Sequence, residues 1–150
     1  MFRARRPETA AARLVGNLRT GRIQRLLCGA TGASVVPLAF EIYLEHYKGS
    51  FGDKWEWVPI WLTPPVVAAG IGGVYSERVA KTALPVTSGL FALCGLIGTV
   101  LHLRGVARKP GGLTGEPWYN LIMGPPLLAP GSLTLVGGLG LVAPLMKREK

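Results

Sequence analysis

The sequence predicts an all-α integral membrane protein with four transmembrane helices, and the first pattern behind this prediction is the spacing of charge. Only 17% of the residues are charged, against about 25% in a typical globular domain. The charges leave four uncharged, mainly apolar runs, at residues 26–40, 58–76, 82–101 and 117–146. About 18 such residues span the hydrocarbon core of a bilayer. The first run reaches that length when it is continued across Glu41 to Leu44.

The second pattern is the uneven distribution of positive charge, which predicts the orientation of the chain. Seven arginines precede the first run, two cations separate the second run from the third, and three follow the fourth, whereas the other two connections hold five. Connections rich in lysine and arginine stay on the cytoplasmic side. We therefore expect both termini in the cytoplasm, most simply at a bacterial inner membrane. This topology also accounts for the net charge of +9, so no nucleic-acid partner is expected.

The predicted organisation has three parts: a basic cytoplasmic arm at 1–24, a transmembrane domain at 25–146 and a cytoplasmic tail at 147–150. In the arm, Leu14, Val15 and Leu18 follow helical spacing among arginines. This pattern favours a short helix lying on the anionic surface of the bilayer.

The first and third spans are predicted at 24–44 and 84–103 as ordinary apolar helices. In the first span Gly29, Ala33 and Pro37 recur at intervals of four, which predicts a smooth face for close helix packing. Cys28 and Cys94 are expected at different depths. A disulfide between them is not expected, because bridged cysteines need α-carbons within about 7 Å.

The second and fourth spans are predicted at 57–75 and 118–146, and both carry prolines. Proline cannot donate a backbone hydrogen bond, so we expect a bend or break near Thr63, before Pro64-Pro65. The fourth span should be interrupted at Gly124-Pro125-Pro126 and again at Pro130.

Short sequence matches predict that the four spans are two repeated helical hairpins. The matched segments are Leu27-Cys28-Gly29 with Leu93-Cys94-Gly95, and Trp57 before Pro64-Pro65 with Trp118 before Pro125-Pro126. Two hairpins of the same orientation would be related by an axis along the membrane normal. Chance similarity of such short segments stays an alternative.

Four polar residues at the external ends of the first and third spans are the candidate site: Glu41, Glu45, His46 and His102. Polar side chains at membrane depth are costly and often functional. Carboxylates and imidazoles together suit a transition metal such as iron, manganese or zinc, and the two histidines alone would suit haem. The alternative is that all four lie at the interface, where charged groups reach water at little cost.

The sequence contains no phosphate-binding loop, nucleophile elbow or paired-cysteine metal motif that would indicate an enzyme. We therefore expect a non-enzymatic membrane subunit or scaffold, in contact with lipid and with a membrane-protein partner or a second copy. One alternative is a metal- or haem-binding membrane protein. Another is a small transporter or channel subunit that uses the Pro-Pro breaks.

Overall fold

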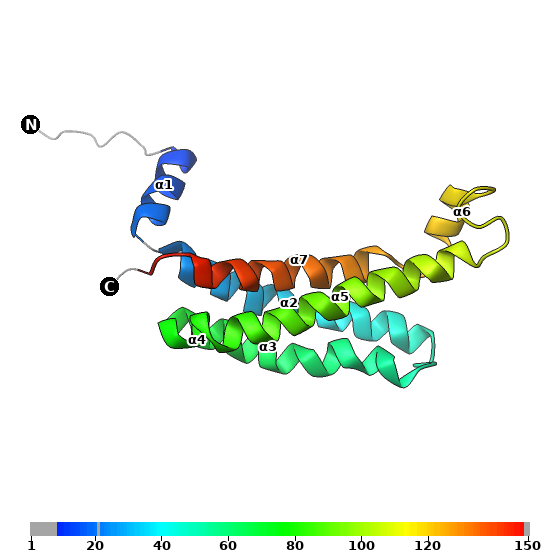
Figure 1. The fold of residues 1–150 in the computed structure, drawn as a ribbon, viewed down its shortest axis with the longest axis horizontal. Helices are drawn as coiled ribbons and strands as arrows, with labels where there is room; N and C mark the ends of the chain where they lie inside the picture. The colour runs from blue at the N-terminus through cyan, green and yellow to red at the C-terminus, as the bar shows by residue number, and fades with distance from the viewer. Residues whose placement is uncertain (1–8, 21, 149–150) are drawn as a thin grey trace, which may run out of the picture.

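The computed structural model describes residues 9–20 and 22–148, and in this part of the chain all regular structure is helical (Figure 1). The expected all-α class is confirmed. The elements in chain order are α1 (Ala10–Thr20), α2 (Arg22–Lys48), η1 (Lys54–Trp57), α3 (Val58–Tyr75), α4 (Glu77–Lys81), α5 (Ala83–Ala107), α6 (Pro117–Ile122), α7 (Leu128–Val142) and η2 (Ala143–Leu145).

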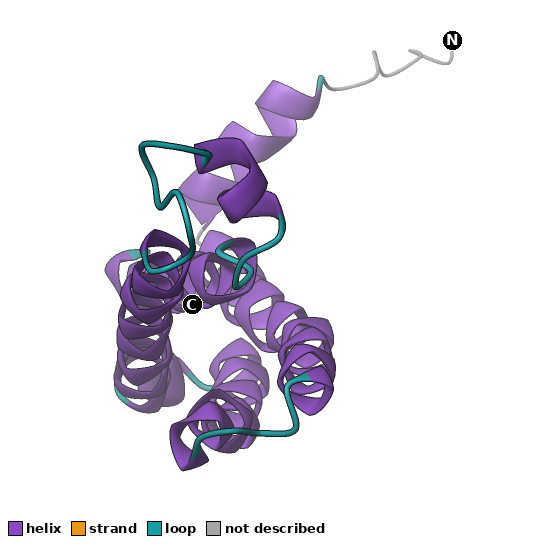
Figure 2. Ribbon diagram, turned by 90° about the vertical axis from the view of Figure 1, so that its right-hand side faces the viewer, coloured by secondary structure: helices purple, strands orange, loops and turns teal. Residues whose placement is uncertain are grey.

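Four helical segments are long and apolar enough to cross a membrane, at Arg22–Lys48, Lys54–Tyr75, Glu77–Ala107 and Leu128–Leu145. They lie side by side as an up-and-down bundle (Figures 1 and 2). We call the end that carries α1, α4 and η2 the terminal end. The opposite end, with the α2–η1 turn, residues 108–116 and α6, is the loop end.

The fourth of these segments is shorter than the sequence suggested. Its helix begins at Leu128, and residues 117–122 form the separate helix α6. The interruption at Gly124-Pro125-Pro126 is confirmed, because no helix covers these residues. Pro130 does not interrupt anything. It lies in the first turn of α7, where the missing N–H of proline has no helical partner to lose.

Of the bend or break expected near Thr63, the break is wrong, because α3 runs without interruption from Val58 to Tyr75. Pro64 and Pro65 lie inside this helix, and both rings are exposed. Each proline removes one backbone hydrogen bond, but the α-helical path continues. The hydroxyl of Thr63 donates to the carbonyl oxygen of Pro59 at 2.9 Å, within the same turn.

The interior of the bundle contains two apolar clusters. One, toward the terminal end, consists of Cys28, Ala69, Ala80, Leu84 and Ala143. The other consists of Val35, Ile42, Val66, Phe91 and Leu133, with Cys94 packed against it. The two cysteines therefore belong to different clusters, and both are free thiols.

Helices α2 and α3 are in contact through glycines. A Cβ atom added to Gly70 would lie 2.7 Å from the Cα of Gly32 and 2.9 Å from the carbonyl oxygen of Cys28. One added to Gly73 would lie 2.9 Å from the sulfur of Cys28. All three distances are shorter than real Cβ contacts. The two helices can approach this closely only because no side chain separates them.

The second hairpin, α5–α7, repeats these contacts. A Cβ on Gly137 would lie 2.7 Å from the backbone nitrogen of Ala92 and 2.6 Å from the carbonyl oxygen of Ser88, and one on Gly140 would meet the side chain of Ser88. In the first helix of each hairpin, Ser88 and Ala92 lie 60 positions after Cys28 and Gly32. In the second helix, Gly137 and Gly140 lie 67 positions after Gly70 and Gly73. This equivalence sets Ser88 against Cys28, whereas the sequence match paired Cys28 with Cys94.

The small residues expected to form the packing face of the first span lie elsewhere. Ala33 and Pro37 are exposed, and Gly29 meets only the tip of Val74. The face of α2 that turns inward carries Gln24, Cys28, Thr31, Gly32 and Val35. The expected packing face is therefore wrong: the buried Cys28 and Gly32 each lie one position before Gly29 and Ala33.

Candidate functional site

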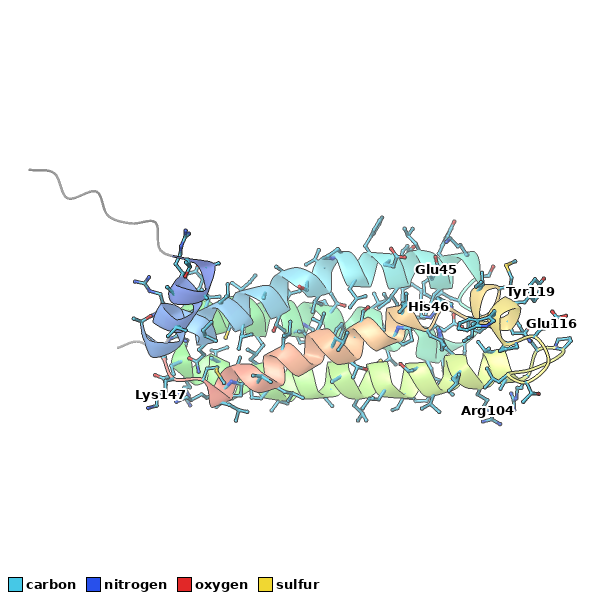
Figure 3. The ribbon with its side chains drawn as sticks, turned by 90° about the horizontal axis from the view of Figure 1, so that it is seen from above. Glu45, His46, Arg104, Glu116, Tyr119 and Lys147 are labelled. Carbon is cyan, nitrogen blue, oxygen red and sulfur yellow. The ribbon has the colours of Figure 1, made fainter. Side chains whose placement is uncertain are left out.

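The four predicted site residues all lie in the half of the bundle nearest the loop end. Glu41, Glu45 and His46 are in the last two turns of α2, and His102 is near the end of α5. Figure 3 places Glu45 and His46 there, far from Lys147 at the terminal end. Helices α2 and α5 are not direct neighbours, because each packs mainly against α3 and α7, so a shared site would have to form across the interior of the bundle.

Each of these side chains has different surroundings. Glu41 is exposed. Glu45 forms an ion pair with Lys48. His102 makes a hydrogen bond of 2.6 Å between its Nδ1 and the carbonyl oxygen of Pro126. Within residues 9–20 and 22–148, no three histidine, cysteine or acidic side chains lie close enough together to hold a metal ion.

His46 has a more specific environment, which includes a residue that the sequence did not single out. Its Nδ1 atom and the Oε2 atom of Glu56 are both buried, and neither has a hydrogen-bond partner among the described residues. His46 also interacts electrostatically with Glu56, His102 and Glu45. Buried polar atoms without partners are costly and call for an explanation. His46 and Glu56 are therefore the core of the candidate site.

Glu56 reaches this position because η1 folds the chain back after α2. Asp53 caps η1, its side chain accepting a hydrogen bond of 3.1 Å from the backbone N–H of Trp55. The pattern Asp53-x-x-Glu56 is the start of a helix with an acidic residue three positions after the cap. This pattern is visible in the sequence, in the connection between the first and second predicted spans.

The turn between α2 and η1 is held by its backbone. The N–H of Phe51 donates to the carbonyl oxygen of His46 at 3.0 Å, and the N–H of Ser50 donates to that of Tyr47 at 2.9 Å. This pair of bonds is a Schellman motif. Ser50 and Phe51 adopt positive φ values of 59° and 47°, which non-glycine residues rarely do. The turn is consequently fixed by tertiary contacts rather than by local preference.

Those contacts come from an aromatic cluster beside His46. Phe51 stacks on Trp57 with 4.1 Å between ring centroids, and Tyr43 lies 5.5 Å from Phe51 and 6.3 Å from Trp57. The ring of His46 lies 6.1 Å from that of Phe51. Phe51 therefore lies next to both Trp57 and His46.

A second part of the loop end is built around Asn120 of α6. This buried side chain donates to the carbonyl oxygens of Pro110 at 2.9 Å and Gly112 at 2.8 Å. Lys109 donates to the carbonyl oxygen of Met123 at 2.7 Å, at the end of α6. The result is an open pocket of about 320 Å³ lined by Lys109, Pro110, Gly111, Glu116, Tyr119 and Asn120.

The terminal end contains a polar network that the sequence reading missed. The buried side chain of Gln24 donates to the carbonyl oxygens of Ala143 at 3.3 Å and Met146 at 3.1 Å. Arg148 donates to those of Gly73 at 2.8 Å and Val74 at 2.6 Å, where α3 ends. A cation at the C-terminus of a helix offsets the partial negative charge of the last carbonyl groups.

The chain was compared with protein-family models, with curated proteins and with solved structures, and no match was found in any of the three.

Proposed function

We propose that this chain is a four-pass integral membrane protein that serves as a non-enzymatic subunit or scaffold, with the terminal end in the cytoplasm. The observation that carries the proposal is the apolar outer surface of the bundle. Large hydrophobic side chains in the middle of the long helices are more than half exposed, among them Val36, Phe40, Leu93, Leu96, Ile97, Val100 and Leu135. A soluble monomer rarely exposes so much contiguous apolar surface.

The orientation is supported by the charges at the two ends. The described cations of α1, of the start of α2, of α4 and of the C-terminal tail gather at the terminal end. This is the side that the positive-inside rule assigns to the cytoplasm. A bacterial inner membrane is the setting that this pattern suits best.

The subunit role is supported by the interior of the bundle. Phe91, Leu84, Val35 and Val66 are fully buried there, and the glycine contacts close each hairpin. A single copy thus presents packed apolar helices to its surroundings, suited to lipid and to a membrane-protein partner or a second copy. The transporter alternative draws no support from Pro125, whose ring packs against the glycine of α5 at position 105.

Labelling of single cysteines tests the topology. In a background with Cys28→Ala and Cys94→Ala, we expect Thr114→Cys at the loop end to react with a membrane-impermeant maleimide on intact cells. Lys147→Cys at the terminal end should react only after permeabilisation. Both positions are exposed, so burial does not confound the comparison. The reverse labelling pattern would refute the orientation, and recovery of the chain in the soluble fraction after an alkaline wash would refute membrane insertion.

The unpartnered atoms of His46 and Glu56 favour one second candidate, a membrane protein that binds a transition metal at the loop end. Glu41, Glu45 and His102 stay predicted ligands, and haem held by the two histidines stays a prediction. The test is elemental analysis and an absorbance spectrum of the protein purified in mild detergent. A stoichiometric metal that is lost in both His46→Ala and Glu56→Gln would support this function, and metal retained in both variants would refute it.

A further inference from the structure

A groove along the outside of α2, at the terminal end of the bundle, has the shape and charge of a lipid site. Its volume is about 550 Å³, and its lining is Arg22, Ile23, Arg25, Leu26, Gly29, Ala30, Ala33 and Val74. Two arginines thus stand at one end of an otherwise apolar surface. The groove does not belong to the His46 site, which is at the opposite end of the bundle.

The lining follows one face of α2. Arg22, Arg25, Gly29 and Ala33 are three or four residues apart, so their side chains share a face of the helix. The twelve residues from Arg22 to Ala33 cover roughly 16 Å at 1.5 Å per residue. Half of a hydrocarbon core about 30 Å thick is a similar distance. The groove therefore extends from the headgroup layer to about the middle of the bilayer.

Because several residues that line the groove are small, an acyl chain can lie directly against the backbone of α2. A Cβ on Gly29 would meet only a methyl group of Val74, at 3.5 Å, and Ala33 is exposed. Arg25 remains at the mouth of the groove, where it donates a hydrogen bond of 3.5 Å to the carbonyl oxygen of Val74.

We propose that this groove binds one anionic phospholipid of the cytoplasmic leaflet, with its phosphate at Arg22 and Arg25 and one acyl chain along Gly29 and Ala33. The proposal rests on the proposed membrane insertion and orientation. Arginines near the surface of a membrane attract anionic lipids by about 1 kcal/mol each. A second copy docked in parallel on the same groove would bring four arginines together, so charge favours the lipid over a dimer.

The test measures lipids that stay bound to the full chain. The protein is purified in mild detergent, mixed with equal amounts of phosphatidylglycerol and phosphatidylcholine, and analysed by native mass spectrometry. We expect one tightly held phosphatidylglycerol, preferred by about thirtyfold if both arginines contribute. The double variant Arg22→Gln/Arg25→Gln should lose this preference and retain phosphatidylglycerol and phosphatidylcholine about equally.

Two matched controls distinguish an effect of the groove from a general effect of lost positive charge or of added side-chain volume. Arg104→Gln/Arg108→Gln removes the same charge from the loop end and should leave the preference unchanged. Ala33→Leu, which fills an exposed part of the groove, should weaken retention of the lipid, whereas Ala68→Leu on the exposed surface of α3 should not. The five substituted positions other than Arg25 are exposed, and Arg25 lies outside the buried clusters, so folding should survive the substitutions.

Equal retention in the groove variants and their controls would overturn the proposal. A dimer that dissociates in Ala33→Leu, with no bound lipid in the wild type, would also overturn it and identify a second copy as the occupant. Extraction from native membranes by an alkaline wash is measured in parallel. A chain that resists the wash but shows no lipid preference refutes only the lipid site, whereas a chain that is washed out refutes the membrane proposal itself.

Discussion

At the scale of single residues, the structure depends on a few contacts between backbone and side chain that join distant parts of the sequence. The side chain of Gln24 in α2 donates hydrogen bonds to carbonyl groups just after the end of α7. It also accepts a hydrogen bond of 3.4 Å from Arg148. Arg148 in turn is bonded to the end of α3. Three helices are thereby tied together at the terminal end by two polar side chains.

Replacing Arg148 should therefore destabilise the bundle. Arg148→Gln removes the donors to Gly73 and Val74, and we expect the free energy of unfolding to fall by about 2 kcal/mol, the usual contribution of hydrogen bonds that involve a charged group. The measurement is thermal unfolding in detergent, followed by circular dichroism. Lys147→Gln is the control, because this neighbouring side chain is exposed. An equal loss of stability in the two variants would contradict the assigned role.

Two adjacent glycines of α7 should respond in opposite ways to a methyl group. In Gly137→Ala the new Cβ would lie 2.6 Å from the carbonyl oxygen of Ser88, so α5 and α7 must separate, at a cost of about 2 kcal/mol. A Cβ at Gly138 meets nothing within 4 Å, and alanine there should stabilise the helix by up to about 1 kcal/mol. Unfolding of the two variants in the same detergent checks this, and similar stabilities would exclude the close glycine contact.

At the scale of elements, the interruption before α7 separates the segment Leu128–Leu145, which is long and apolar enough to cross a membrane, from the short helix α6. This turn of the backbone needs a glycine at position 124, because a Cβ atom there would collide with the carbonyl oxygen of Asn120. Since α6 has only six residues, it is too short to be stable alone. Its position depends on the buried side chain of Asn120, which is bonded to residues 110 and 112.

Asn120→Ala should accordingly loosen α6 without unfolding the bundle. The variant leaves two carbonyl groups of the loop without their donor, which costs about 1–3 kcal/mol where those groups are buried. We expect faster amide hydrogen exchange in residues 108–123 and unchanged exchange in α2, α3 and α5. Thr114→Ala in the same loop serves as the control, because Thr114 is exposed. Uniformly faster exchange along the chain would show that Asn120 supports the whole fold instead.

At the scale of the whole molecule, the tryptophans lie at one end. Trp55, Trp61 and Trp118 are 68%, 69% and 76% exposed, and Trp57 in η1 stacks on Phe51. All four belong to η1, the first turns of α3, or α6. Tryptophan favours the headgroup layer of a bilayer, so the loop end should mark one membrane surface.

Fluorescence quenching in vesicles tests this placement. Because all four tryptophans are at the loop end, lipids brominated near the headgroup should quench the emission more strongly than lipids brominated near the ends of the acyl chains. Trp61→Phe should increase this contrast, since Trp61 lies one turn further into α3 than Trp57. Stronger quenching from the acyl-chain ends would place the loop end inside the hydrocarbon and contradict the proposed position of the bundle.

The sequence by itself determined the helical class and the four apolar helices, because apolar run length and the position of charges depend only on the order of residues. It also located the interruption at Pro125, where the low helix propensity of Gly124 adds to that of the two prolines. It misjudged Pro64, because an α-helix can lose two exposed hydrogen bonds and continue when its other faces are packed. It also proposed a repeat, but paired Cys28 with the wrong position of α5 for the contacts that close the hairpins.

Only the tertiary structure decided which residues of the candidate site come together. Glu41, Glu45, His46 and His102 were chosen for their type and their depth, but the direction of a side chain depends on how its helix is rotated in the bundle. That rotation turned Glu41 outward and directed His102 to Pro126. The turn after α2 brought Glu56 to His46. Packing across the bundle brought Arg148 to the end of α3, a contact that no local sequence pattern records.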